Sequence, residues 1–586
     1  MPATTGDDDF RSGYLDYAAL TRRLEGWAAA YPELVALSSI GTTPEGREIW
    51  VLTVGPEPQR SRPAVWVDGN MHGAELAGSS VALAVAEAAL ALHLGLGVLP
   101  GGPTDAFPEH LPEHLRAFLR DVPFYICPRL SPDGAEPVLR RGGFVRSAPR
   151  PSQGAPDLPR WRHQDLDGDG RCRYLRLPDP AGDFVASPQH PGLMLPRRVE
   201  DPPPYWRLYP EGVIDGWDGE TIPEPQWLEG TPDFNRNFPW DWHAEPGQVG
   251  AGPYPGSEPE TRAVIEFAVA HPQLYAWLNL HTFGGVFIRP LIDAPDARMD
   301  PGDLAVYRQL AAWGRACVGY PTVSGFEEFT YAPETPLHGD LTEFAYHQRG
   351  CVAQVCELWD LFERLGQPRP RRFVEHYTTF DRAAMERLAD WDATHNARRL
   401  FRPWQALAHP QLGALEAGGL DPVIGLWNPP PEALPALCAG IADYWLRVAS
   451  LVPRLAIAEM RCEPLGGDYR ELRVTVENRG YLPTHGVNAA RERPWNVGVE
   501  AWLETEGCRL CEPGRARQHL GHLEGWGRGL DEAAHMPWYQ RSRGSGHRAR
   551  ARWLIRGEGR VTLHVGGPRL GCLTQTLHTG AGSPGS

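Results

Sequence analysis

Residues 64–80 read Ala-Val-Trp-Val-Asp-Gly-Asn-Met-His-Gly-Ala-Glu-Leu-Ala-Gly-Ser-Ser. The stretch begins as a short apolar strand over residues 64–67 and breaks at the Asp-Gly-Asn of residues 68–70, which is a strong turn signal. Small and apolar residues typical of a helix follow from about Glu75. His72 and Glu75 are three residues apart at this junction, so on a helix that has already begun their side chains would converge from one face.

A histidine and a glutamate at this spacing suggest a metal site, because zinc is commonly held by such a pair and a distant third ligand, with the fourth position left to water. Taken alone, His-x-x-Glu is a weak signal, and an ordinary surface pair is the commoner explanation. The position of the pair favours the metal site, since it follows the end of a strand, where open α/β sheets place their ligands.

The composition limits the classes of function. The 586 residues contain no lysine, and 57 basic against 73 acidic side chains give a net charge of −16. An acidic chain without a basic cluster argues against binding to nucleic acid or to an anionic membrane surface. The N-terminus has no apolar signal segment and the cysteines are mostly isolated, which predicts a cytoplasmic protein with reduced thiols. The most apolar window, residues 81–100, is interrupted by Glu87 and His93 and predicts a buried helix and loop.

Alternating strands and helices predict an α/β fold. Apolar runs at residues 122–127, 274–280 and 351–356 have the length of buried strands, and helix-like segments lie between them. This order predicts a sheet covered by helices on both faces. After Glu357 helical segments are expected, followed by Asn-Pro-Pro-Pro at residues 428–431 and a helix to about Val452.

The pattern changes near residue 453. Apolar residues then alternate strictly with polar ones, as at residues 472–476, and the alternating runs are separated by turns rich in Gly and Asn. Such short strands predict a small β-sandwich. We therefore expect two domains, a large α/β domain at residues 1–452 and a β-sandwich accessory domain at residues 453–586.

A long segment at about residues 135–230 is rich in Pro and Gly, so it consists of functional loops or forms a folded insertion. Within it, Asp165, Asp167 and Asp169 are spaced like the front half of a calcium loop. The bidentate Glu of such a loop is missing, because the twelfth position is Arg176. Two interpretations of this segment therefore compete, a calcium site and a plain Asx-rich turn.

Functional candidates stand at the ends of three expected strands. They are the pair His72 and Glu75, then His281, and then Glu357. A lone histidine at a strand end is usually a structural residue, but four such residues in this order are harder to explain in that way.

Together with two further motifs, these residues make the chain resemble the zinc metallocarboxypeptidase family of the carboxypeptidase A/B type, over roughly residues 14–360. The motifs are specific only in combination: His-Gly-Ala-Glu at 72–75, Ser-Pro-Asp-Gly at 131–134, Asp-Phe-Asn-Arg-Asn at 233–237, the strand-end His281, and Glu357 in Glu-Leu-Trp. The resemblance implies a mixed sheet with helices on both faces, one catalytic zinc ion, and a catalytic domain completed by about residue 452.

The resemblance also implies roles for the site residues. His72, Glu75 and His281 correspond to the zinc ligands, and Glu357 corresponds to the general base and acid. Two histidines and one glutamate leave zinc an open position, where bound water loses its proton near neutral pH. Glu357 would take that proton and later deliver it to the leaving amine. Asp233 corresponds to the acid that accepts the free N–H of the first ligand histidine.

The substrate-binding residues follow from the same resemblance. Asn235 and Arg236 correspond to the pair that grips the terminal carboxylate of the substrate, and a planar guanidinium suits that group. Arg146 corresponds to the arginine that stabilises the oxyanion. Three nearby arginines are rivals for that role: Arg140, Arg141 and Arg150. Tyr331 corresponds to a mobile tyrosine that contacts the substrate, and a buried aromatic residue is the competing interpretation.

These correspondences predict a zinc-dependent metallocarboxypeptidase that hydrolyses C-terminal bonds of peptides with a free carboxylate, by a zinc-bound water that Glu357 promotes. The alternative keeps the zinc chemistry and changes the substrate, to give an amide hydrolase or deacylase acting on acylated amino acids or peptidoglycan-type peptides. A non-catalytic binding protein on the same scaffold would be expected to have lost a ligand or the base, and all four residues are present. Side-chain specificity and oligomeric state stay open.

Overall fold

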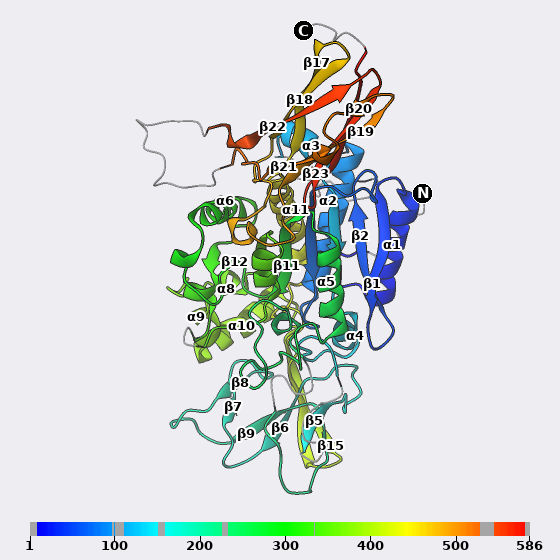
Figure 1. Ribbon diagram of the computed structural model, residues 1–586. Helices are drawn as coiled ribbons and strands as arrows, with labels where there is room; N and C mark the ends of the chain where they lie inside the picture. The colour runs from blue at the N-terminus through cyan, green and yellow to red at the C-terminus, as the bar shows by residue number, and fades with distance from the viewer. Residues whose placement is uncertain are drawn as a thin grey trace.

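An eight-stranded mixed sheet forms the centre of the fold (Figure 1). The computed structural model describes residues 9–96, 99, 111–150, 159–225, 232–332, 335–527 and 544–580. The strands of the sheet are, in spatial order, β1 (Val35–Thr42), β2 (Glu48–Val54), β4 (Phe124–Cys127), β3 (Ala64–Gly69), β11 (Leu274–Thr282), β14 (Val352–Leu358), β12 (Val286–Arg289) and β13 (Thr322–Ser324). The central strands β4, β3, β11 and β14 run parallel, and antiparallel strands flank them. The apolar runs in the sequence are these central strands, because strands buried on both faces are continuously apolar.

Helices cover both faces of this sheet (Figure 1). Trp66 of β3 contacts Phe267 of α5 (Pro259–Ala270) with the ring centroids 4.9 Å apart. On the opposite face, by strand alternation, Gln354 of β14 accepts a hydrogen bond from Tyr444 of α11 (Leu434–Ala449). The other helices are α1 (Tyr17–Ala30), α2 (Ala77–Leu94), α3 (Glu113–Leu119), α4 (Pro132–Arg141), α6 (Pro301–Val318), α7 (Leu341–Glu343), α8 (Leu361–Arg364), α9 (Glu375–Thr378) and α10 (Arg382–His395). The α/β class predicted from the sequence is confirmed.

The apolar helix α2 lies inside the fold. Among the described residues it is the one helix long and apolar enough to cross a membrane, judged by length and composition, and 89% of its apolar window is buried. It approaches the sheet closely, since a Cβ on Gly78 would come within 2.8 Å of the backbone nitrogen of Asn70. The buried helix expected within residues 81–100 is therefore present, while residues 97, 98 and 100 of the loop after it lie outside the described residues.

The segment after α4 is a folded insertion. Its strands β6 (Tyr174–Pro178), β7 (Phe184–Ala186), β8 (Met194–Pro196) and β9 (Trp206–Pro210) join a six-stranded sheet with β15 (Phe401–His409) and β16 (Gly413–Leu420). Strands β5 (Arg160–His163) and β10 (Gly212–Asp215) form a separate pair. Figure 1 shows this insertion at one end of the molecule and the C-terminal strands at the other.

The hairpin of β15 and β16 lies among the helical segments expected after Glu357 and was not predicted. Burial along β15 does not alternate with a period of two, so the run lacks the usual strand pattern. β16 reads Gly-Ala-Leu-Glu-Ala-Gly-Gly-Leu, and Gly, Ala and Glu are depleted in strands. The hairpin forms because β16 pairs with β6, more than two hundred residues earlier in the chain, which no local pattern can indicate.

The Asp-rich turn of the insertion does not support the predicted calcium site at Asp165, Asp167 and Asp169. Asp165 accepts two backbone N–H groups of its own turn, at 2.7 and 2.9 Å, and Asp169 pairs with Arg173. Asp165 and Asp167 approach Glu211, whose carboxylate already accepts backbone N–H groups. Carboxylates whose oxygens already accept hydrogen bonds from their own turn form an Asx-rich turn, the alternative to a calcium site given in the sequence analysis.

The C-terminal strands form two four-stranded sheets. One contains β17 (Leu455–Gly466), β18 (Tyr469–Asn478), β22 (Arg548–Arg556) and β20 (Arg509–Leu510), and the other contains β21 (Arg517–Gly521), β19 (Val499–Glu506), β23 (Arg560–Gly567) and β24 (Gly571–His578). Alternate residues of both sheets share one apolar core, which includes Leu472, Val474, Val476, Val561 and Leu563. The predicted β-sandwich is confirmed.

A buried arginine joins the sandwich to the central sheet. Arg569 is 1% exposed and donates to the carbonyl groups of Leu274, at the start of β11, and of Arg349. Close by, Asp303 of α6 accepts the backbone N–H of Asn488 at 2.8 Å. The sandwich is thus fixed at the amino end of β11, away from the carboxyl end where His281 lies.

Candidate metal centre and active site

Three side chains from two neighbouring strands converge at the carboxyl edge of the sheet. His72 and Glu75 lie in the turn after β3, and His281 lies near the end of the parallel strand β11. His72 Nδ1 is 2.8 Å from Glu75 Oε1 and 3.1 Å from His281 Nδ1, and His281 Nδ1 is 3.0 Å from Glu75 Oε2. All three residues are buried. Two imidazole nitrogens and one carboxylate directed at one point are a ligand set that suits zinc and leaves it an open position.

The turn that carries the first two ligands is not helical. The helix α2 begins only at Ala77, so the helix has not yet begun at His72 and Glu75, and the two do not share a helix face. They converge because the turn packs tightly against the Ser-Pro-Asp-Gly motif: a Cβ on Gly73 would lie 2.6 Å from the carbonyl oxygen of Gly134. Only glycine allows this approach of two backbones.

Asp233 connects His72 to Arg146. Asp233 Oδ1 lies 3.2 Å from His72 Nε2, and Oδ2 accepts hydrogen bonds from Arg146 at 3.0 Å. Arg146 Nη1 also lies 3.5 Å from Glu75 Oε1. Burial alone would raise the pKa of Asp233, but the charges of Arg146 and Arg236 hold it well below its usual range. The ionised carboxylate therefore fixes both the imidazole and the guanidinium.

The three rival arginines are placed elsewhere. Arg150 pairs with Glu260 at 2.6 Å, and Arg140 is largely exposed and pairs with its own helix. Arg141 is the last residue of α4 and is exposed. Of the four, Arg146 is the one whose guanidinium contacts a residue of the metal-ligand group.

A buried chain of hydrogen bonds supports His281, and the sequence analysis missed it. His281 Nε2 approaches Asn279 Oδ1, and Asn279 donates to Asp68, its cross-strand partner in β3. Asp68 also accepts the indole N–H groups of Trp66 and Trp277 at 2.7 and 2.8 Å. Burial raises the pKa of Asp68 to about 6, although the hydrogen bonds from these donors act to lower it. The sequence did contain a signal for this chain of hydrogen bonds. Asp68 and Asn279 are polar residues within apolar strands, where each needs a hydrogen-bond partner.

Glu357 lies beside the ligand group. In the parallel pair of β11 and β14 it is the direct partner of His281. In the part of the chain that the structure describes, no side chain or backbone group forms a hydrogen bond with its carboxylate. Burial raises the pKa of Glu357 to about 8, with His281 and Arg146 acting to lower it and Glu75 to raise it. A carboxyl group with this freedom and this pKa can exchange a proton near neutral pH.

Asn235 and Arg236 lie on η2 (Phe234–Arg236), a short 3₁₀ helix capped by Asp233. Asn235 Oδ1 accepts the N–H of Leu341 at 3.0 Å, which fixes the amide. Arg236 donates to the carbonyl of Asn235 at 2.6 Å, and among the described residues no carboxylate pairs with it. An unpaired, half-buried guanidinium next to Asp233 is suited to bind an anion.

Tyr331 is 55% exposed, so it is not the buried aromatic residue of the competing interpretation. Desolvation raises the pKa of its hydroxyl, the charge of Glu357 raises it further, and Arg146 and Arg236 lower it. Its ring therefore lies within electrostatic reach of three other predicted site residues. Residues 333 and 334, which follow it closely, lie outside the described residues.

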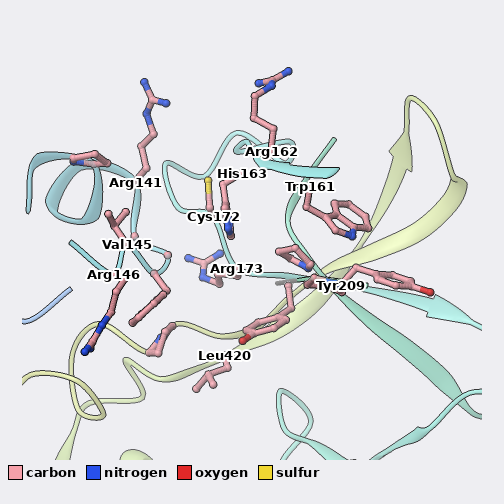
Figure 2. Close-up of a pocket in the computed structure, with 18 of the residues that line it drawn as sticks. Arg141, Val145, Arg146, Trp161, Arg162, His163, Cys172, Arg173, Tyr209 and Leu420 are labelled. Atoms are coloured by element: carbon pink, nitrogen blue, oxygen red, sulfur yellow. The ribbon is translucent and has the colours of Figure 1, made fainter. Parts of the chain in front are cut away.

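A cavity of about 620 Å³ opens beside Arg146 (Figure 2). Figure 2 shows Arg141, Val145 and Arg146 along one wall, and Trp161 and Tyr209 of the insertion along the other. The three metal-ligand residues lie outside this cavity. Arg146 thus lines both the metal-ligand group, through its contact with Glu75, and a cavity that the insertion helps to enclose.

The family model described as zinc carboxypeptidase matches residues 20–173 and 219–379, which is more than half of the chain. The chain belongs to the zinc carboxypeptidase family, and the resemblance inferred from its motifs is confirmed. Zinc is the metal that this metalloprotease family implies, and the donors of His72, Glu75 and His281 fit it. Residues 454–578 match a second family, described as a domain of unknown function.

Individual relatives are similar over shorter stretches. Mouse carboxypeptidase D is 35% identical over 140 residues, which cover 21% of this chain and 9% of that protein. Human carboxypeptidase Z is 26% identical over 197 residues, which cover 32% of this chain and 27% of that protein. Bovine thrombin-activatable fibrinolysis inhibitor, solved with tick carboxypeptidase inhibitor, is 14% identical, with 75% of this chain and 98% of that chain covered at a TM-score of 0.41. A structural similarity this low adds nothing to the family assignment.

Proposed function

We propose that this protein is a zinc-dependent metallocarboxypeptidase that removes residues from the C-terminus of peptides. The observation that carries the proposal is the guanidinium of Arg236, which pairs with no carboxylate in the described part of the chain. Arg236 lies one residue beyond Asn235, on the short helix that Asp233 joins to the metal-ligand group. A cation at this place gives the substrate a fixed end, so that the bond next to its terminal carboxylate lies at the metal.

The terminal carboxylate is bound by Arg236 and Asn235. A guanidinium offers two parallel N–H donors to a carboxylate, and the side-chain amide of Asn235 adds another donor because its oxygen is already occupied by Leu341. A C-terminal amide carries no charge and loses the charge-assisted part of this binding. Selectivity for free acids over amides follows.

Glu357 moves the protons. His72, Glu75 and His281 would hold the zinc ion, which would act as a Lewis acid towards the scissile carbonyl and towards water. Glu357 accepts the proton of the attacking water and passes it to the amine that leaves. Burial, which raises the pKa of Glu357, helps this carboxyl group to hold the proton until the amine nitrogen takes it.

Arg146 supplies positive charge next to the reaction. Its guanidinium lies 3.5 Å from Glu75 and is held by Asp233, so it stays beside the metal ligands without rearrangement. A cation that is already oriented stabilises the negative charge that develops on the carbonyl oxygen.

A second candidate function uses the same groups on a different substrate. The cavity of about 620 Å³ beside Arg146 favours an amide hydrolase that accepts a bulky acyl group on an amino acid or on a peptidoglycan-type peptide. Such an enzyme still needs the free carboxylate at Arg236, and it differs in what lies on the other side of the scissile bond.

The test compares matched substrates on the zinc-loaded protein. Each peptide is supplied with a free and with an amidated C-terminus, beside acylated amino acids, and the products are identified by mass spectrometry. The proposal expects single residues to be released from the free acids and, because a hydrogen bond to a charged group is lost, at least roughly tenfold slower release from the amides. Preference for acylated amino acids would favour the second function. Equal cleavage of acids and amides would contradict both.

A further inference from the structure

A second group of metal-ligand side chains lies near η2 and α7. Asp241 and His243 follow η2, and His338 precedes α7. Asp241 Oδ2 is 2.6 Å from His338 Nδ1, and Asp241 Oδ1 is 3.5 Å from His243 Nε2. The two imidazole rings stack with centroids 3.6 Å apart and an angle of 3° between their planes, so the exposed His243 ring would have to turn before both rings direct a nitrogen at one ion. One donor atom from each residue lies within 4.8 Å of the other two.

This donor set suits a first-row divalent ion. Two imidazoles and one carboxylate bind zinc with positions left for water, and imidazole also suits copper and nickel. The donors of the catalytic group, His72, Glu75 and His281, lie 2.8 to 3.1 Å apart, against 2.6 and 3.5 Å for the two contacts of Asp241 here. The side chains of Asp241 and His243 are 38% and 48% exposed, so an ion can reach them, while His338 is 15% exposed and forms the fixed side of the group.

The surroundings favour a cation. Burial, together with the charges of Asp340, Asp293 and Asp241, raises the pKa of Glu343 well above its usual range. Asp340, Asp293 and Asp241 thus each place a negative charge near Glu343. A divalent ion beside Asp241 offsets this charge.

The group connects two loops that are in direct backbone contact. The N–H of Phe238 donates to the carbonyl of Gly339 at 2.9 Å, and the N–H of His338 donates to Gln248 Oε1 at 3.1 Å. A Cβ on Gly339 would lie 2.3 Å from the carbonyl oxygen of Arg236. One loop thus carries Arg236, and the other leads into α7.

We propose that Asp241, His243 and His338 bind a second divalent transition-metal ion, and that this ion fixes the loop of Arg236 against the loop that leads into α7. Binding of the ion does not depend on the proposed peptidase function. An effect of the ion on binding of the substrate carboxylate rests on the proposed peptidase function. In that function Arg236, whose loop the ion holds, binds the carboxylate.

The test counts zinc on the full chain. Metal-free protein is dialysed against buffered micromolar Zn²⁺, and bound zinc is measured by elemental analysis. We expect two equivalents for the wild type, one for His243→Ala or His338→Ala, and one for His72→Ala. The exposed His114 of α3 lies outside every group of convergent metal donors found in the described part of the chain, so His114→Ala is the matched control and keeps two.

Hydrogen exchange distinguishes an ion that fixes the two loops against each other from an ion that binds adventitiously. In the His72→Ala protein, Zn²⁺ is expected to slow exchange in peptides covering residues 233–250 and 336–342, and this slowing is lost when His243→Ala is added. Two equivalents in both His243→Ala and His338→Ala, or a single wild-type equivalent that both variants keep, would overturn the proposal. Zinc binding without slowed exchange would refute the claim that the ion fixes the two loops against each other. One wild-type equivalent that His72→Ala keeps and His243→Ala loses would uphold this site and refute the catalytic zinc.

Discussion

Glu357 and His281 are direct partners across two parallel strands, β14 and β11, so the carboxylate proposed to move protons stands beside an imidazole proposed to bind zinc. Partner residues on neighbouring strands lie about 5 Å apart, and a slip of one residue would turn either side chain to the other face. The distance between base and metal is therefore set by the register of the sheet. On the other side of β11, the parallel strand β3 leads directly into the turn of His72 and Glu75.

Replacing Arg236 tests the carboxylate grip. We expect Arg236→Ala to raise KM for free-acid peptides at least roughly tenfold, because a charge-assisted hydrogen-bond pair is lost, and to leave the slow cleavage of amidated peptides unchanged. Arg236→Lys keeps the charge but loses the planar pair of donors, so its KM should lie between the KM of the wild type and that of Arg236→Ala. Steady-state kinetics on matched acid and amide peptides measure this. An equal loss on both substrates would contradict a grip on the carboxylate.

Replacing Arg146 tests the stabilisation of developing charge. Arg146→Ala should lower kcat by roughly a hundredfold to a thousandfold with a small change in KM, as expected when a preorganised donor to an oxyanion is removed. Arg140→Ala is the control, since Arg140 is exposed and pairs with Glu136 of its own helix, and it should behave as wild type. If the two variants lose the same amount of activity, the role assigned to Arg146 is wrong.

The Asp68–Asn279–His281 chain makes a prediction about zinc affinity. Asn279→Ala frees the His281 ring from its partner, and loss of such a support typically weakens metal binding by roughly 10-fold to 100-fold. The control is Asn478→Ala, which removes a buried asparagine of the sandwich that donates to the carbonyl of Leu482. Competition with a chromophoric chelator measures the affinity. Equal zinc affinity in the two variants would exclude a supporting role for Asn279.

Asp303 predicts a pH dependence of stability. Burial raises the pKa of Asp303 from 3.8 to about 6, so the folded protein holds this proton more tightly than the unfolded chain does. The resulting stabilisation is fully present below pH 3.8 and is lost as the pH rises through 6. At about 1.4 kcal/mol per pKa unit, the loss is roughly 3 kcal/mol.

The comparison with Asp303→Asn isolates this group, because the variant does not titrate there. Urea unfolding of both proteins should show the wild type losing roughly 2 kcal/mol relative to the variant between pH 4 and pH 7, because part of the stabilisation is already lost at pH 4. Parallel pH profiles would mean that Asp303 keeps an ordinary pKa in the folded protein.

The sequence predicts the part of the site that depends on strand ends. His72, Glu75, His281 and Glu357 each follow or end a buried apolar run, and parallel strands bring their carboxyl ends to one edge. The β-sandwich was equally visible, because strands with one face in the core alternate with a period of two.

Features that depend on distant pairing could not be read from the sequence. Asn279 meets Asp68 only because β3 and β11 are neighbours in register, and His338 meets Asp241 only because two loops touch. The split of the chain at residue 452, the roles of the individual site residues and the cytoplasmic location stay predictions.

The most direct measurement of the central claim compares the wild type with Glu357→Gln, both loaded with zinc, on one peptide that has a free C-terminus. Because the amide cannot take up or deliver the proton, we predict the same zinc at the catalytic ligands and a kcat lower by roughly 10²-fold to 10⁴-fold in the variant. A variant that binds zinc and still releases the C-terminal residue within a few-fold of the wild-type rate would contradict the account.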